Sequence, residues 1–314
     1  MASTKTLLVV LIAALAQSSL AQNSIYKSTP LPEGLLGVGK PFPRMENGTV
    51  LTHSGYTNSP APSLTVFRLT GTSPTAASLW PADSAVVSVH DACARAGHGA
   101  VAVVQAVNAS EQRAWLVMSL DPSGRVESEF RTNPYVAHQV AVDGSGNIWT
   151  LGVDSEAKEH KADYNIMREY SPDGQLLRSA VPRSTFATKL DPSVNVGGTV
   201  GFSFLRARGP NIAAYIAQTC EWIEVAPDGQ VVSRAKVRMP ANPGYPATYP
   251  LILAVTQSGS VFLQSAGFSV CKLDVQSGAC SAVNEPKEAL LGASGNDLLF
   301  YSLSAPTHAD WVHP

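Results

Sequence analysis

Two histidines are the residues of this 314-residue chain whose type and spacing best suit ligand binding. His90 and His138 lie 48 residues apart, and each is followed by a polar residue, Asp91 and Gln139. Imidazole nitrogens bind transition metals or hydrogen-bond to polar ligands near neutral pH. The pair therefore predicts a binding site if the fold brings the two positions together.

A third group near the C-terminus belongs to the same prediction. We align the segment that begins at Ala100 with the segment that begins at Ile148. In this alignment His90 and His138 start equivalent strands. The equivalent position in the last repeat is occupied by Lys287 and Glu288. The predicted ligand-binding residues are His90, Asp91, His138, Gln139, Lys287 and Glu288, with His160 on a loop above them. A divalent metal is one candidate cofactor, but no zinc-type spacing requires it, and histidines packed at strand starts are the alternative.

Short strands and glycine turns must position these residues. Aliphatic residues occur in short runs that Gly, Pro, Asp and Ser interrupt, which indicates an all-β chain. Four segments share the plan strand, turn, strand, with a glycine where the turn requires a positive φ. These turn glycines are Gly124, Gly174, Gly229 and Gly278, spaced 50, 55 and 49 residues apart, and a fifth copy turns near Gly71. That period is typical of β-propeller blades, which have four strands each.

A second type of hairpin alternates with the first. Its clearest copy is His138–Val153, and Leu251–Ser265 repeats it. Six copies of this inner hairpin and five of the outer one predict six blades, with five or seven as alternatives. The last blade needs two outer strands, and Ser24–Leu31 and Asp310–His313 are available to close the ring and protect its edges.

The turn motifs resemble those of the NHL and SMP-30-like six-bladed propellers. The resemblance rests on Val140–Gly152 (VAVDGSGNIWTLG) and on Tyr170–Gly174 (YSPDG), and it covers most of residues 35–304. In the SMP-30-like lactonases, a glutamate near the first strand begins a metal site, and Glu33 resembles that element. The part of the fourth blade that should continue the metal site reads Gly201–Arg208 (GFSFLRAR), which departs from the pattern.

The first 21 residues have the three regions of a secretory signal peptide. Lys5 precedes the apolar run Leu7–Ala16, and Ser19-Leu20-Ala21 gives the small-x-small cleavage pattern. The run is too short to span a membrane, which needs about 20 residues. We therefore expect a signal peptide at 1–21, one propeller domain at 22–314, and a secreted or periplasmic location. The formal net charge of −2 becomes −3 once Lys5 is removed, which argues against nucleic acid and anionic membranes as partners.

The cysteines and glycosylation motifs add smaller predictions. Cys271 and Cys280 flank one outer hairpin turn symmetrically, so a disulfide between them is expected in a secreted chain. Cys93 and Cys220 belong to different blades and are expected to stay unpaired. Asn47 and Asn108 begin Asn-x-Ser/Thr motifs, whose use depends on the host. Trp80, Trp115, Trp149 and Trp222 occupy hairpin positions typical of core aromatics, whereas Trp311 lies outside the repeat.

The sequence favours binding over catalysis without settling the function. It contains no nucleophile elbow, phosphate-binding glycine loop, HExxH or CxxC motif, so no catalytic residue is predicted. Long connections such as Val153–Asn165, Val181–Gly198 and Met239–Pro250 share one face of the disc, where binding residues concentrate. We expect a monomeric propeller that binds a small molecule, a glycan or a protein on that face. The alternatives are a metal-dependent hydrolase or lactonase of the SMP-30-like type and a carbohydrate-recognising propeller.

Overall fold

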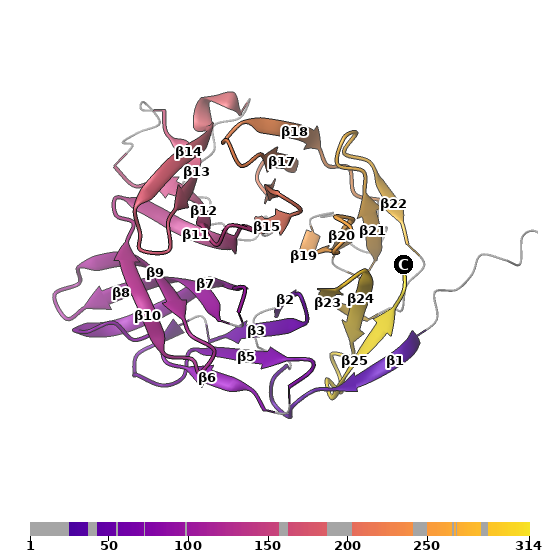
Figure 1. The fold of residues 1–314 in the computed structure, drawn as a ribbon, viewed down its shortest axis with the longest axis horizontal. Helices are drawn as coiled ribbons and strands as arrows, with labels where there is room; N and C mark the ends of the chain where they lie inside the picture. Colours follow the sequence, from indigo (N-terminus) through magenta and orange to yellow (C-terminus); the bar gives the residue numbers. More distant parts are fainter. Residues whose placement is uncertain are drawn as a thin grey trace, which may run out of the picture.

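The chain forms six antiparallel sheets arranged in a ring. The structure is a computed structural model, and it describes residues 25–314 apart from 37–42, 55, 72, 98, 157–162, 187–202, 241–249, 266, 268 and 284–287. Within the described residues the strands follow one another around a central axis, so that the chain circles once from β2 to β25 (Figure 1). This confirms the six-bladed β-propeller. The predicted signal peptide at 1–21, His160 and Lys287 lie outside the described residues.

The first three blades follow the predicted order of an inner and then an outer hairpin. Blade 1 consists of β2 (Arg44–Glu46), β3 (Thr49–His53), β5 (Leu64–Arg68) and β6 (Thr75–Ala77). Blade 2 consists of β7 (Ser84–Ala94), β8 (Ala100–Asn108), β9 (Arg113–Leu120) and β10 (Val126–Arg131), and the short β4 (Tyr56–Thr57) adds a fifth strand beside β7. Blade 3 consists of β11 (Tyr135–Val142), β12 (Ile148–Asp154), β13 (Asn165–Tyr170) and β14 (Leu176–Pro182), followed by the short 3-10 helix η2 (Arg183–Thr185).

The last three blades include the ring closure. Blade 4 consists of β15 (Phe204–Arg208), β16 (Asn211–Ile216), β17 (Glu221–Val225) and β18 (Val231–Lys236). Blade 5 consists of β19 (Pro250–Val255), β20 (Val261–Ser265), β21 (Val270–Leu273) and β22 (Cys280–Ala282). Blade 6 consists of β23 (Ala289–Ser294), β24 (Asp297–Tyr301), β25 (His308–Val312) and β1 (Ile25–Pro30). The N-terminal strand is therefore the outermost strand of the last blade, as predicted.

The turn glycines stand where the sequence places them. Gly124, Gly174, Gly229 and Gly278 each join the third strand of a blade to the fourth and have φ between +73° and +91°. They therefore share one side of the disc, which we call the turn side; the connections between blades emerge on the opposite loop side. Gly278 also needs its lack of a side chain, because a Cβ there would lie 2.0 Å from the carbonyl oxygen of Lys236.

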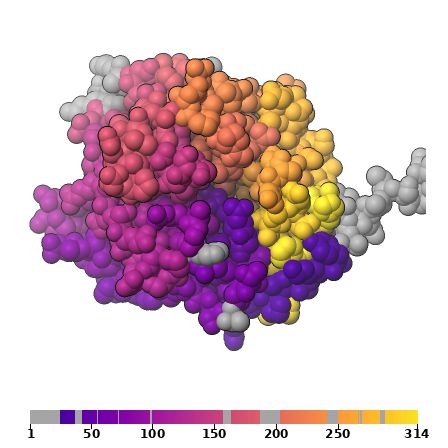
Figure 2. Space-filling model, in the orientation of Figure 1, coloured from indigo at the N-terminus to yellow at the C-terminus, as the bar shows by residue number. Residues whose placement is uncertain are grey.

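Apolar side chains fill the space between neighbouring blades. Each of the six interfaces has its own buried cluster, and the one between blades 2 and 3 includes Val101, Val117, Tyr135 and Val140. The space-filling view shows the blades succeeding one another around a hollow near the centre (Figure 2). No helix among the described residues is long and apolar enough to cross a membrane.

Candidate functional site

A buried arginine joins four blades inside the central channel. Arg44 begins β2 and is 7% exposed. Its guanidinium donates to Oε1 of Glu46 from Nε (3.0 Å) and Nη2 (2.6 Å), and to Oδ2 of Asp91 from Nη1 (2.6 Å). It also donates to the carbonyl oxygens of Val140 (2.7 Å) and Leu205 (3.1 Å). The five hydrogen bonds connect blades 1, 2, 3 and 4.

The charges in the channel are strongly coupled. Burial by itself would lower the pKa of the Arg44 guanidinium, but Asp91 and Glu46 outweigh burial and hold that pKa above its ordinary value. Asp91, one of the predicted residues, also accepts a hydrogen bond from the Val140 amide at 2.9 Å. The structure thus assigns Asp91 to an ion pair in the channel. Sequence reasoning missed Arg44 and Glu46, although two charges at alternate positions of an otherwise apolar strand were the available signal.

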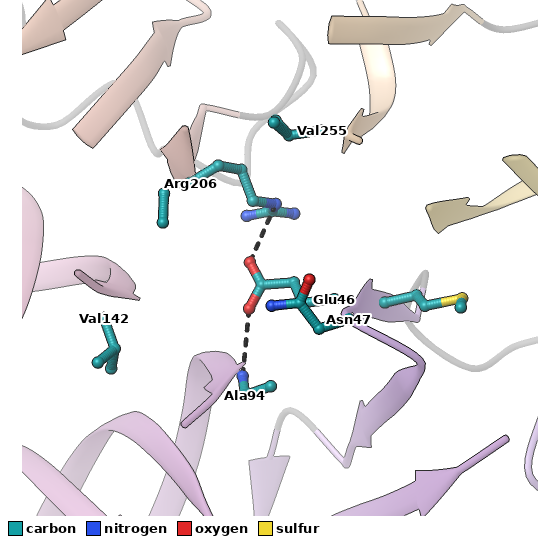
Figure 3. Close-up of a pocket in the computed structure, with 8 residues that line it drawn as sticks. Glu46, Asn47, Ala94, Val142, Arg206 and Val255 are labelled. Atoms are coloured by element: carbon teal, nitrogen blue, oxygen red, sulfur yellow. Dashed lines mark hydrogen bonds and ion pairs between the residues drawn. The ribbon is translucent and has the colours of Figure 1, made fainter. Parts of the chain in front are cut away.

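On the turn side the channel opens into a small pocket, which we call the channel-mouth pocket. Its volume is about 80 Å³, and its walls come from the inner strands of five blades: Met45, Glu46, Asn47, Ala94, Val142, Arg206, Ala207 and Val255. Glu46 of β2 and Arg206 of β15 point toward one another across the opening, and Asn47 lies beside Glu46 (Figure 3). The sequence placed any site on the loop side and did not predict this pocket.

The two predicted histidines do meet. The ring centroids of His90 and His138 are 5.5 Å apart, and the Trp115 ring lies 4.8 Å from the first and 5.4 Å from the second. Burial and then His90 lower the pKa of His138 to about 4; burial and then His53 lower the pKa of His90 as well. Both rings are therefore neutral at pH 7. Nε2 of His90 is buried and has no hydrogen-bond partner among the described residues.

A β-bulge positions each of these histidines. In β7, Val89 pairs with Val104 and Asp91 with Val103, so His90 is an extra residue without a partner in β8. In β11 the pairing shifts in the same way around His138. Bulges redirect side chains and are frequent beside binding sites.

Blade 2 extends on the loop side into a groove lined by polar and aromatic residues. The groove has a volume of about 280 Å³ and is lined by Tyr56, Val86, Ser88, Gln105, Val107 and Arg113. Strand pairing places Tyr56 opposite Ser88, Ser88 opposite Gln105, and Gln105 opposite Trp115, so these four side chains form one row across β4, β7, β8 and β9. Gln105 also lies near enough to the His90 ring to act against the lowering of its pKa by burial. We call this surface the blade-2 groove; Trp115, at the end of the row, contacts the rings of both histidines.

The other predicted ligand residues are not placed with the histidines. Gln139 is half-buried in β11, directly after the bulge. Glu288 precedes β23 in blade 6, where burial and the nearby Asp310 raise the pKa of its carboxyl. In that blade the bulge lies at Leu291, so Leu291 is the counterpart of the two histidines.

A metal site of the lactonase type is not assembled by the described residues. Among them, no three His, Cys, Asp or Glu side chains are grouped so that they could hold a metal ion. Glu33, the residue that resembles the first lactonase ligand, is exposed between β1 and β2. The described donor set therefore does not fit a metal held by three protein ligands.

The expected Cys271–Cys280 disulfide is not present, because both cysteines are free. In the sheet Cys271 pairs with Ala282 and Cys280 with Leu273, so the two cysteines are diagonal neighbours. The Cα atoms of such positions are about 7–8 Å apart, whereas those of a disulfide lie within about 6.8 Å. A hydrogen bond with Cys280, and then burial, raises the pKa of the Cys271 thiol. Cys93 and Cys220 are also free, as predicted.

The remaining sequence features take ordinary structural places. Trp149 and Trp222 are fully buried and Trp80 is partly buried against an apolar cluster, as predicted for core aromatics. Of the two glycosylation motifs, Asn47 is exposed in a turn with φ +48°, whereas Oδ1 of Asn108 accepts hydrogen bonds from the backbone of its own loop.

Comparison with known proteins finds likeness in solved structures only. No protein-family model and no curated protein matches the chain. A glucose dehydrogenase has 12% identity and a TM-score of 0.44, with 92% of this chain and 99% of that chain covered. BamB from Moraxella catarrhalis has 10% identity and a TM-score of 0.42, with coverage of 92% and 99%. The calcium-binding protein regucalcin from Agrobacterium tumefaciens has 12% identity and a TM-score of 0.37, with coverage of 71% and 66%. At such scores these likenesses carry no argument about what this chain binds.

Proposed function

We propose that the protein is a secreted binding propeller whose ligand is a neutral saccharide held in the blade-2 groove. The observation that carries the proposal is the row of Tyr56, Ser88, Gln105 and Trp115 across four adjacent strands. It places an aromatic ring at each end and hydrogen-bonding groups between them. Saccharides need this combination, because their C–H faces stack on rings while their hydroxyls bond to amides and hydroxyls.

The exposure of the row supports ligand access. The Tyr56 side chain is 66% exposed, so its ring is open to a ligand. Ser88 and Gln105 are half-buried, and Arg113 is exposed at the edge. Trp115 is 8% exposed and packs against both histidine rings. A ligand would therefore lie along the sheet with one end against the buried cluster.

The histidines suit a neutral partner. With both pKa values lowered by burial, each ring is uncharged and offers one donor and one acceptor nitrogen. A ligand hydroxyl at the inner end would satisfy the buried Nε2 of His90. The strands that build the groove emerge on the loop side, where the sequence places the ligand.

Saturation-transfer NMR with linear tetrasaccharides tests the proposal. The probes are maltotetraose, cellotetraose, xylotetraose and chitotetraose. We expect transfer to at least one of them, and about a tenfold weaker affinity for Gln105→Ala and for Tyr56→Ala, the effect of one hydrogen bond or one stacked ring. Gln175→Ala is the matched control, because Gln175 is exposed in an outer turn of blade 3. The proposal fails if no saccharide receives saturation, or if all three variants bind as the unmodified protein does.

A further inference from the structure

Arg206 has hydrogen-bond donors that find no partner among the described residues. A guanidinium carries five N–H donors. Nη1 of Arg206 donates to the carbonyl oxygen of Leu205 at 2.9 Å, and Nε lies 3.7 Å from Oε1 of Glu46, too far for a hydrogen bond. No other acceptor for Arg206 occurs within the described part of the chain. Although the side chain is only 8% exposed, none of its nitrogens is fully enclosed without a partner, so the remaining donors are open to the pocket.

The carboxylates of the channel are already satisfied by other groups. Oε1 of Glu46 accepts two hydrogen bonds from Arg44, and its Oε2 accepts one from the Ala94 amide at 3.2 Å. Asp91 accepts from Arg44 and from a backbone amide. Arg44 is therefore the hydrogen-bonded partner of both acids, whereas Arg206 has only a longer ion pair with Glu46 at 3.7 Å. Burial, and then the charge of Arg44, lower the pKa of Arg206 to about 10, although Glu46 and Asp91 act in the opposite direction.

Asn47 supplies a second polar group at the same place. It follows Glu46 in the turn between β2 and β3 and lines the channel-mouth pocket with Arg206. Its side chain lies beside Glu46 and faces the opening (Figure 3). Its amide makes no hydrogen bond with the described residues. The Asn47 carboxamide and the Arg206 guanidinium thus place donors on two sides of the pocket.

We propose that the channel-mouth pocket binds a small oxyanion through Arg206, with Asn47 as a second donor. The guanidinium fork matches the two oxygens of a carboxylate or phosphate group. A volume of about 80 Å³ fits an ion of that size or the anionic end of a longer molecule. The ligand is a free inorganic oxyanion or the carboxylate end of a longer molecule. This site is separate from the blade-2 groove and lies on the opposite side of the disc.

Isothermal titration calorimetry at constant ionic strength tests the oxyanion site. The probes are sodium phosphate, sodium sulfate, sodium acetate and N-acetylglycine, the last of which represents a peptide end. We expect one ion to bind per protein. Arg206→Met keeps the apolar stem and removes the donors, so affinity should fall about ten- to a hundredfold, the effect of losing charge-assisted hydrogen bonds. Asn47→Gly keeps the positive φ of residue 47 and should weaken binding a few-fold.

Two further variants keep the test decisive. Arg206→Lys retains the positive charge but lacks the planar guanidinium, so it should lose most of the affinity. This variant keeps the test available if Arg206→Met does not fold. Arg125→Met removes an arginine that is 84% exposed on the rim, and it should bind like the unmodified protein. Tighter binding of phosphate or sulfate than of acetate identifies an inorganic oxyanion, and tighter binding of N-acetylglycine than of acetate identifies a chain end. The site would be overturned if none of the four probes binds, or if Arg206→Lys and Asn47→Gly both bind the probes as tightly as the unmodified protein does.

Discussion

Replacement of Arg44 by methionine should destabilise the whole propeller. Arg44 makes five hydrogen bonds with groups of four blades and is the close cationic partner of Glu46 and Asp91. Methionine has a similar length but leaves both carboxylates without that partner in a buried channel. Removing one partner of a buried ion pair lowers the free energy of unfolding by about 3–5 kcal/mol. Summing individual hydrogen bonds would give more, but the channel relaxes and water enters when the pair is broken.

Thermal and urea unfolding followed by near-ultraviolet circular dichroism measure this loss. For a chain of this size we expect Tm to fall by about 6–15 °C, at roughly 2–3 °C per kcal/mol. Arg125→Met is the control, because Arg125 forms an exposed ion pair on the rim, and it should not change Tm.

A double variant separates the ion pair from packing. Adding Asp91→Asn to Arg44→Met removes one of the two negative charges that the first substitution leaves without Arg44. The two effects should therefore be less than additive, with a coupling of about 0.5–3 kcal/mol. A loss below about 1 kcal/mol for Arg44→Met, or strict additivity in the double variant, would refute the conclusion that Arg44 holds the channel together.

Three other predictions concern the turns, the histidines and the N-terminus. Gly278→Ala should lower the free energy of unfolding by about 2 kcal/mol or more, because φ is +73° and the new Cβ would meet a backbone oxygen. Urea titration measures this loss. In the same titration the control Gly144→Ala, which has open space around the new Cβ, should change the free energy of unfolding by less than about 0.5 kcal/mol. The pKa of His138 is about 4 in the folded protein and 6.5 in the unfolded chain, so its contribution to stability is full above pH 6.5 and is lost as the pH falls toward 4. His138→Gln should therefore reduce the fall in the free energy of unfolding between pH 7.5 and 4.5 by roughly 1–3 kcal/mol. Edman sequencing of protein exported by a secreting host should begin at Gln22, and an intact Met1 on the exported chain would contradict the predicted cleavage.

The repeat was readable because a turn glycine is a local requirement. Gly124 and Gly174 need a positive φ whatever surrounds them, so their spacing reveals the blades without any knowledge of contacts. Ring closure followed from counting, since a blade with two strands must borrow the other two from the termini. The β1–β25 pairing confirms that step, with Thr29 opposite Ala309.

The channel could not be predicted in the same way. The carbonyl group that Arg44 reaches in Leu205 is 161 residues away, and nothing local to either position marks the contact. The disulfide prediction was wrong for a related reason. Symmetry about a turn says that two cysteines are near each other, but the pairing register decides whether they are opposite or diagonal, and here it makes them diagonal.

One inserted residue explains why neighbouring positions of β7 serve different sites. On the loop side, Ser88 faces the groove opposite Gln105, and regular alternation would put Ala92 on that face four residues later. The bulge at His90 shifts the alternation by one, so Asp91 takes that face instead, at the depth where it reaches Arg44. β11 has the same shift at His138, which places both histidines at the level where the two strands change register. The inner strands are thereby divided into a groove half and a channel half, with the histidines at the boundary between them.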